Sequence, residues 1–340
     1  MLRFLKYLFL GLLSVLFLLV LVDRLTPKLK LAFIKPLFDK GGVQANAGLE
    51  EFVPIGIVSI KDIPYKEKDT DAFLDIFYPE HQVKNDEKLP IVIWIHGGGW
   101  VAGAKSDVQN YCKMIAHKGF MVVAVEYTLA PKGIYPKPVQ QVMDAIYFLN
   151  QKAEEYPGNT ENIFLAGDSA GAQIAAQVAA IGSDPSYAGQ VNVEPSFKRE
   201  HLSGVVLYCG FLNVPRLDGT WFFKWLTEAF LWSYGGSNDY ENDPYFQTVN
   251  VINALNENFP PTFLSVGNID PIRSHSYKFA KQLDSLEVPV KTLFFEDDYP
   301  VNLTHEYQFD WKLDEARLAF DQMIDFLFNL AFTKNNESVD

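Results

Sequence analysis

The amino-acid sequence predicts an α/β fold in which helices cover both faces of a mostly parallel β-sheet. Short apolar segments typical of buried strands alternate with amphipathic helical segments along most of the chain. Two glycine-rich turns each follow one of these strands. With 340 residues, 48% of them hydrophobic, the chain can bury a large core. We therefore expect one α/β domain at residues 56–332, followed by a polar tail at 333–340.

The N-terminal segment is apolar without interruption from residue 7 to residue 22, with Arg3 and Lys6 before it and Arg24 after it. This stretch is slightly shorter than the ~20 residues that span a bilayer, but apolar neighbours extend it. No small-residue cleavage motif follows it. We expect residues 1–24 to form an uncleaved, single-pass membrane anchor, with a cleaved secretion signal and a buried helix as alternatives. Basic residues on both flanks leave the orientation open, and we place the domain outside the cytoplasm.

The elements of the domain follow in order. Residues 25–55 show little periodicity and predict a linker with short capping helices. Segments 58–65 and 72–78 alternate apolar and polar residues, as in an antiparallel edge pair. Segments 90–95 and 121–125 are continuously apolar, as in strands buried on both faces. A helix begins at Pro138. We further expect strands at 163–166, 205–209, 262–266 and 290–295, and helices at 172–180 and 313–330.

An insertion at residues 212–250 interrupts the alternation of strands and helices. It is apolar on every side, so it must be buried or must line a pocket. We interpret it as a cap that shapes an apolar substrate pocket, with core packing and membrane contact as alternatives. The aromatic residues expected to line this pocket are Trp100, Trp221 and Trp225.

Composition excludes several classes of function. A formal net charge of −13 argues against binding to nucleic acid, which requires clustered Lys and Arg. Cys112 and Cys209 lack metal-type spacing and are expected to be buried free thiols. No phosphate-loop or dinucleotide-binding pattern occurs in the sequence. We therefore expect no metal and no cofactor, and the sequence does not indicate an oligomeric state.

The two glycine-rich turns carry the chemistry. Residues 167–171, Gly-Asp-Ser-Ala-Gly, present Ser169 on a tight turn from strand to helix, where small neighbours let the backbone bend and expose the hydroxyl. Residues 96–100, His-Gly-Gly-Gly-Trp, string glycines together, so that their N–H groups can point at a developing oxyanion. Together these turns indicate an acyl-transfer site.

A serine nucleophile needs a base and an orienting acid at the same edge of the sheet. Of the six histidines, only His305 follows a strand by a loop at that edge without belonging to the glycine turn, and we assign it as the base. Asp270 directly follows the strand at 262–266 and is the expected acid. Asp168 adjoins the serine and is expected to support the site instead. The other candidates for the acid are Glu296, Asp297 and Asp298, which resemble a solvated loop.

These motifs resemble the hormone-sensitive-lipase-like branch of the α/β-hydrolase carboxylesterases over residues 72–330. The resemblance implies that the N–H groups of Gly98, Gly99 and Ala170 bind the oxyanion. Residues 127–131, Tyr-Thr-Leu-Ala-Pro, are similar to a Tyr-Arg-Leu-Ala-Pro element of that branch, with Thr128 in place of Arg. Glu306 stands where the residue after the histidine is commonly Gly.

The expected function is therefore that of a serine hydrolase that cleaves small carboxylic esters through an acyl-enzyme on Ser169. An amidase of the same fold, including one acting on aryl formamides, is the first alternative. A catalytically inactive hydrolase fold that serves as a binding module is the second, although every position of the triad is filled.

Overall fold

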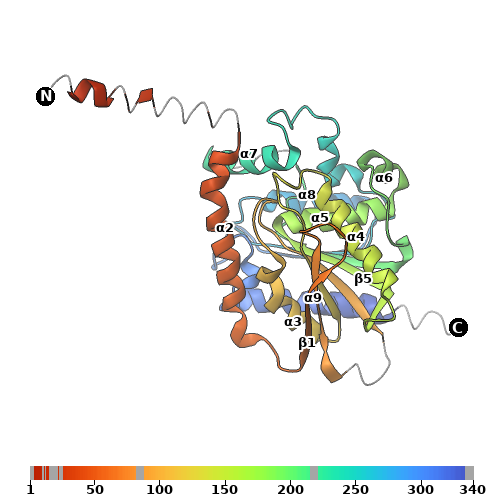
Figure 1. Cartoon of the computed structure of the whole chain (residues 1–340). Coiled ribbons are helices and arrows are strands. Elements are labelled where there is room, and N and C mark those ends of the chain that lie inside the picture. The colour runs from red at the N-terminus through yellow and green to blue at the C-terminus, as the bar shows by residue number, and fades with distance from the viewer. Residues whose placement is uncertain are drawn as a thin grey trace.

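In the computed structural model, residues 4–9, 11, 13–14, 22, 26–81, 88–214 and 221–333 are described. An eight-stranded sheet runs through the domain in the order β1-β2-β4-β3-β5-β6-β7-β8 (Figure 1). β1 and β2 form an antiparallel edge, β2 is antiparallel to β4, and the remaining neighbours are parallel. The mostly parallel sheet predicted from the sequence is confirmed. Its strands are β1 (Ile57–Pro64), β2 (Phe73–Pro79), β3 (Leu89–Ile95), β4 (Met121–Val125), β5 (Gly158–Asp168), β6 (Leu202–Tyr208), β7 (Thr262–Val266) and β8 (Val290–Phe294).

Helices cover both faces of the sheet. On one face, α3 and α9 pack against Val92 and Trp94 of β3; on the other, α4, α5 and α8 pack in the core that contains Ile91 and Ile93. Because successive residues of a strand point to opposite faces, β3 is apolar at every position and fully buried. The helices are α2 (Lys28–Gly48), α3 (Gln109–His117), α4 (Lys137–Gln151), α5 (Ser169–Ser183), α6 (Pro185–Val191), α7 (Trp221–Gly235), α8 (Arg273–Ser285) and α9 (Asp314–Thr333).

β5, the strand that leads directly into Ser169, is longer than predicted. β5 begins at Gly158, whereas the sequence pattern suggested residue 163. The additional residues are polar, yet Gly158 and Asn159 pair with Leu89 and Pro90 of β3. Backbone pairing at this end of the sheet therefore extends beyond the apolar pattern, which reports only the buried part of a strand.

The prediction for residues 25–55 was wrong in one respect. In place of a linker with short helices, α2 is a single helix of 21 residues that runs along one side of the domain (Figure 1). Only a narrow stripe of it is covered, including Leu31 and Ile34, while Phe33 and Leu37 are exposed. Exposed apolar residues on the outer side blur the helical periodicity that the sequence analysis relied on.

The insertion at 212–250 contains α7 and the short helix at Phe246–Val249. α7 contacts α2, so two segments far apart in the sequence meet over one end of the sheet. In the N-terminal part of the chain, many residues of the predicted anchor at 1–24 lie outside the described residues. No helix formed by residues that the structure does describe has the length and hydropathy needed to cross a membrane.

Candidate active site

Ser169 lies on a sharp turn between β5 and α5. Its backbone is left-handed, with φ of 50°, a conformation that a non-glycine residue rarely adopts. The turn fits only because its flanks lack side chains: a Cβ on Gly171 would lie 2.1 Å from the carbonyl oxygen of Ile95, and one on Gly167 would lie 2.7 Å from the same atom. This close approach holds the serine at the carboxyl edge of the sheet.

Two further side chains predicted from the sequence meet Ser169 there. His305 Nε2 lies 2.9 Å from Ser169 Oγ, and His305 Nδ1 lies 2.7 Å from Asp270 Oδ2. Asp270 is buried, and its other oxygen accepts a hydrogen bond of 2.8 Å from the backbone N–H of Ile272. The carboxylate therefore fixes the imidazole ring with Nδ1 protonated and Nε2 facing the serine hydroxyl.

The competing acids lie elsewhere. Glu296, Asp297 and Asp298 are exposed, and Asp297 pairs with Arg273 at 2.6 Å. His275, the other histidine near Asp270 in the sequence, is buried in α8 and contacts the edge of the Phe211 ring.

The ionisation of His305 follows from its neighbours. Burial lowers the pKa of the imidazole, but the charge and hydrogen bond of Asp270 outweigh this effect, and Glu306 and Asp168 add to it. The net pKa of His305 is raised to about 9. An imidazolium formed here during a reaction would thus be stabilised by the surrounding carboxylates.

The glycine turn lies beside this group. The backbone of Gly98 and Gly99 is left-handed, and the carbonyl oxygen of Gly98 accepts hydrogen bonds from Val101 and Ala102. Within the described part of the chain, no hydrogen bond uses the N–H of Gly98 or Gly99. Ala170 is the second residue of α5, where a backbone N–H has no acceptor inside the helix. These three donors are therefore available to a ligand.

Asp168 ties the glycine turn to the nucleophile strand. Its Oδ2 accepts the N–H of Gly97 and its Oδ1 accepts the indole N–H of Trp94, both at 2.8 Å. Burial, followed by the negative charge of Glu306, raises the pKa of Asp168 above the ordinary value of a carboxyl group. Asp168 makes no contact with His305 Nδ1, which Asp270 occupies. The placement agrees with the supporting position expected from the sequence.

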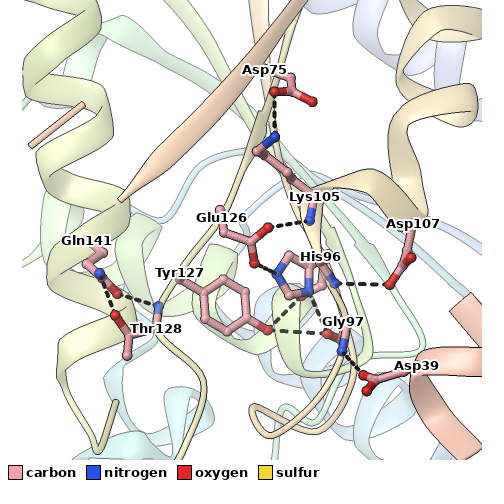
Figure 2. A network of polar contacts seen from close by, with 12 residues as sticks. Asp39, Asp75, His96, Gly97, Lys105, Asp107, Glu126, Tyr127, Thr128 and Gln141 are labelled. Atoms are coloured by element: carbon pink, nitrogen blue, oxygen red, sulfur yellow. Dashed lines mark hydrogen bonds and ion pairs between the residues drawn. The ribbon is translucent and has the colours of Figure 1, made fainter. Parts of the chain in front are cut away.

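His96 holds the turn from its other side (Figure 2). Its ring stacks on Tyr127 at a centroid distance of 4.3 Å, with Nδ1 2.8 Å from the carbonyl oxygen of Gly97 and Nε2 3.4 Å from Glu126. Glu126 also accepts the backbone N–H of Lys105. Burial lowers the pKa of His96, but the Glu126 carboxylate more than offsets this, so the net pKa lies above the ordinary value. A protonated ring donates toward both partners.

Thr128 occupies the position where the resembling family has Arg. It exchanges two hydrogen bonds of 2.8 Å with Gln141 of α4, one through its backbone N–H and one through its hydroxyl (Figure 2). Gln141 also donates to Asp69 at 3.1 Å, so a neutral pair beside a carboxylate occupies this position.

An apolar cavity of about 240 Å³ adjoins the serine. Phe38 of α2 and Phe230 of α7 form part of its wall and pack edge to face at 5.4 Å. Thr227 is the polar side chain in the wall apart from Ser169 and His305, and its hydroxyl is bonded to backbone carbonyls of α7. The remaining lining residues are Gly99, Phe211, Phe223, Leu226, Pro271 and Ile272.

Two of the three pocket residues expected from the sequence, Trp100 and Trp225, are not in this wall. Trp100 has a left-handed backbone that turns its ring into the core, where it stacks on Tyr234 and bonds Gln173. Trp225 lies on another face of α7, with the Lys30 ammonium 5.5 Å from its ring centroid. Of Trp221 only the backbone is described, as the first residue of α7.

Phe38 is a pocket residue that the sequence analysis missed. The signal was present in the sequence, because Leu31, Ile34 and Phe38 follow one another at the spacing of a helix face.

One group of side chains has metal-type proximity: ligand atoms of Cys209, Asp270 and His305 lie within 4.8 Å of one another. The group does not fit a metal, because His305 and Asp270 are hydrogen-bonded to each other. Burial raises the pKa of the Cys209 thiol well above its usual range, so it stays protonated and donates to Gln308. Cys209 and Cys112 are both buried free thiols.

Comparison with known proteins identifies relatives among hydrolases and esterases. The chain is 28% identical over 214 residues to a putative α/β hydrolase of Acanthamoeba polyphaga mimivirus, covering 62% of this chain and 60% of that protein. It is 26% identical over 298 residues to the versiconal hemiacetal acetate esterase of Dothistroma septosporum, covering 82% of this chain and 84% of that protein. The chain thus spans less than two thirds of the viral relative.

Solved structures share the fold. Esterase B of Lactobacillus rhamnosis superimposes with a TM-score of 0.79 at 22% identity, covering 92% of this chain and 98% of that one. The sequence model of the BD-FAE family matches residues 74–283. The predicted resemblance to α/β-hydrolase esterases is confirmed by this match and these relatives. Because the match extends over more than half of the chain, this protein belongs to the BD-FAE family and has the α/β-hydrolase fold.

Proposed function

We propose that this protein is a serine carboxylesterase that hydrolyses small esters through an acyl-enzyme on Ser169. The observation that carries the proposal is the continuous chain of contacts from Ser169 through His305 to Asp270, at 2.9 and 2.7 Å. Such a chain makes a serine hydroxyl nucleophilic, since the base accepts its proton and the acid orients the base. The esterase names of the relatives agree with the proposal.

The reaction takes two steps. In the first, Ser169 Oγ attacks the ester carbonyl while its proton passes to His305 Nε2; the alcohol then leaves with that proton. In the second, water attacks the acyl-enzyme, gives a proton to His305, and the carboxylic acid leaves. Both steps pass through an oxyanion, which the N–H groups of Gly98, Gly99 and Ala170 would bind.

The cavity beside Ser169 defines the substrate group that it would hold. Phe38 and Phe230 pack against each other in its wall, and no charged side chain other than His305 lines it. We assign it to an apolar part of the ester, because a charged group would lose its hydration there without a partner. A volume of about 240 Å³ suits a short acyl chain or a small ring.

Turnover of a series of p-nitrophenyl esters from acetyl to palmitoyl tests the proposal. Ser169→Ala should lower turnover by on the order of 10⁶, because the triad acts as a unit. The matched control is Ser285→Ala, a serine at the exposed end of α8, which should behave as the wild type. Failure of a fluorophosphonate to label Ser169 would refute the proposal, and turnover of matched amides at or above that of esters would replace it with an amidase.

A further inference from the structure

Glu306 is placed unusually for a side chain that follows the base. Its backbone is left-handed, with φ of 59°, a conformation natural to the glycine that is common at this position in the resembling family. This conformation turns the side chain back toward the site, where Oε1 lies 3.7 Å from His305 Nε2. The same oxygen lies close to the glycine turn, 2.9 Å from where a Cβ on Gly97 would be.

A cavity of about 60 Å³, with both carboxyl groups and apolar side chains in its wall, lies beside Glu306. Asp168, Gly97 and Gly98 line it from the sheet, and Gly42 and Ala45 close it from α2. A single water needs roughly 10–15 Å³ of such space and two or more polar partners. This cavity therefore has room for water beside Glu306, and a second cavity, of about 410 Å³, is lined by both Glu306 and His305. Water can thus reach the base on the side of Glu306.

We propose, on the basis of the esterase function above, that Glu306 positions the water that hydrolyses the acyl-enzyme. A separation of 3.7 Å is too long for a direct hydrogen bond between Glu306 Oε1 and His305 Nε2. It is short enough for one water molecule to contact both atoms, donating one hydrogen to each. Water held in this way has its oxygen fixed beside the base that must take its proton.

In this step the water oxygen bonds to the acyl carbon as its proton passes to His305 Nε2. The resulting tetrahedral intermediate then breaks its bond to Ser169 Oγ, which recovers the proton from His305, and the carboxylic acid departs. Glu306 accepts a hydrogen bond throughout and takes no proton. Acylation has no such water, since the serine hydroxyl itself supplies the proton.

Only deacylation uses this water. Comparing the rates of acylation and deacylation therefore distinguishes the positioning of water from a general electrostatic effect on His305. Glu306, Asp270 and Asp168 are the charged groups that surround His305, and each favours its protonated form. Loss of that electrostatic effect would alter acylation and deacylation together. Loss of a water contact slows deacylation alone.

Glu306→Gln in the full chain tests the proposal by stopped-flow release of p-nitrophenol from p-nitrophenyl butyrate, with sites counted by fluorophosphonate titration. On the plateau of the pH profile, where His305 is neutral in both enzymes, we expect kcat to fall at least tenfold and KM to fall in parallel, so that kcat/KM stays within about threefold of wild type. A burst approaching one p-nitrophenol per site should appear. Glu306→Gly, which suits the left-handed backbone, should give the same result if Gln disturbs the fold.

The matched control is Glu296→Gln, an exposed carboxylate in the same loop, which should leave kcat and KM unchanged. An equal fall in kcat and kcat/KM, or wild-type kinetics without a burst in both Glu306 variants, would overturn the proposal. These results differ from failure of the esterase function itself, in which the wild type would neither react with the fluorophosphonate nor hydrolyse the ester.

Discussion

The activity of this protein should depend steeply on pH because of the charges around His305. Asp270 lies 2.7 Å from one ring nitrogen, and Glu306 lies 3.7 Å from the other. Asp168 adds a third acidic group, and together they overcome the effect of burial and raise the pKa of His305 to about 9. The free enzyme must lose this proton before the ring can act as a base, so activity should increase as the pH rises.

The size of the effect follows from the titration curve. A base with a pKa of about 9 is ~1% neutral at pH 7 and half neutral at pH 9. If kcat/KM follows the neutral fraction, it should rise by roughly tenfold per unit between pH 6 and pH 8, and by about 50-fold between pH 7 and pH 9.

A pH-stat assay with an alkyl ester such as ethyl butyrate measures kcat/KM without the rapid background hydrolysis of p-nitrophenyl esters at high pH. Glu306→Gln removes one negative charge, so the pKa of His305 should fall and the rising limb should move to lower pH. Glu296→Gln, with its exposed carboxylate, should leave the limb in place. A wild-type plateau that begins at or below pH 7 would refute the assignment of a raised pKa to the base.

Further expectations concern the turn, the supporting acid, the pocket and the N-terminus. Gly99→Ala brings a Cβ within 2.8 Å of the Phe230 ring, so kcat should fall by ~10²–10³ as an oxyanion donor shifts, and adding Phe230→Ala should recover part of it. Asp168 accepts hydrogen bonds on both carboxylate oxygens, whereas the amide of Asp168→Asn can accept on only one, so Tm in a thermal melt should fall by a few degrees. Phe38→Ala should shift the preferred p-nitrophenyl ester toward longer acyl chains, measured as kcat/KM. Removing residues 1–24 should release the protein from membranes in a flotation assay, if that segment is the anchor.

The sheet and the arrangement at its edge could be predicted because local sequence determines them. Buried strands such as β3 and β4 are continuous apolar runs, and their first and last residues agree closely with the predicted ones. Ser169, Asp270 and His305 each follow a parallel strand, and the carboxyl ends of parallel strands lie at one edge. Predicting that these three residues converge therefore required only the order of the strands and helices, without any knowledge of side-chain packing.

The pocket could not be predicted in the same way. Whether an aromatic residue lines it depends on which face of a helix points inward, and residues two positions apart on α7 point in directions about 200° apart. For this reason Phe223 lies in the wall of the pocket, whereas Trp225 does not. A left-handed backbone turned Trp100 into the core, which an apolar pattern cannot reveal.

The position of α2 links the pocket wall to the N-terminal part of the domain. Its ion pair from Lys30 to Glu228, at 2.9 Å, and the contact of Phe38 with Phe230 join α2 to α7. The sheet fixes the reacting groups, whereas these two helices, from distant parts of the chain, supply the pocket wall. Substitutions between α2 and α7 can therefore alter the size of the pocket while the hydrogen bonds of the triad remain intact. Under the proposed esterase function, the choice of ester and the chemistry of its cleavage thus depend on separate parts of the structure.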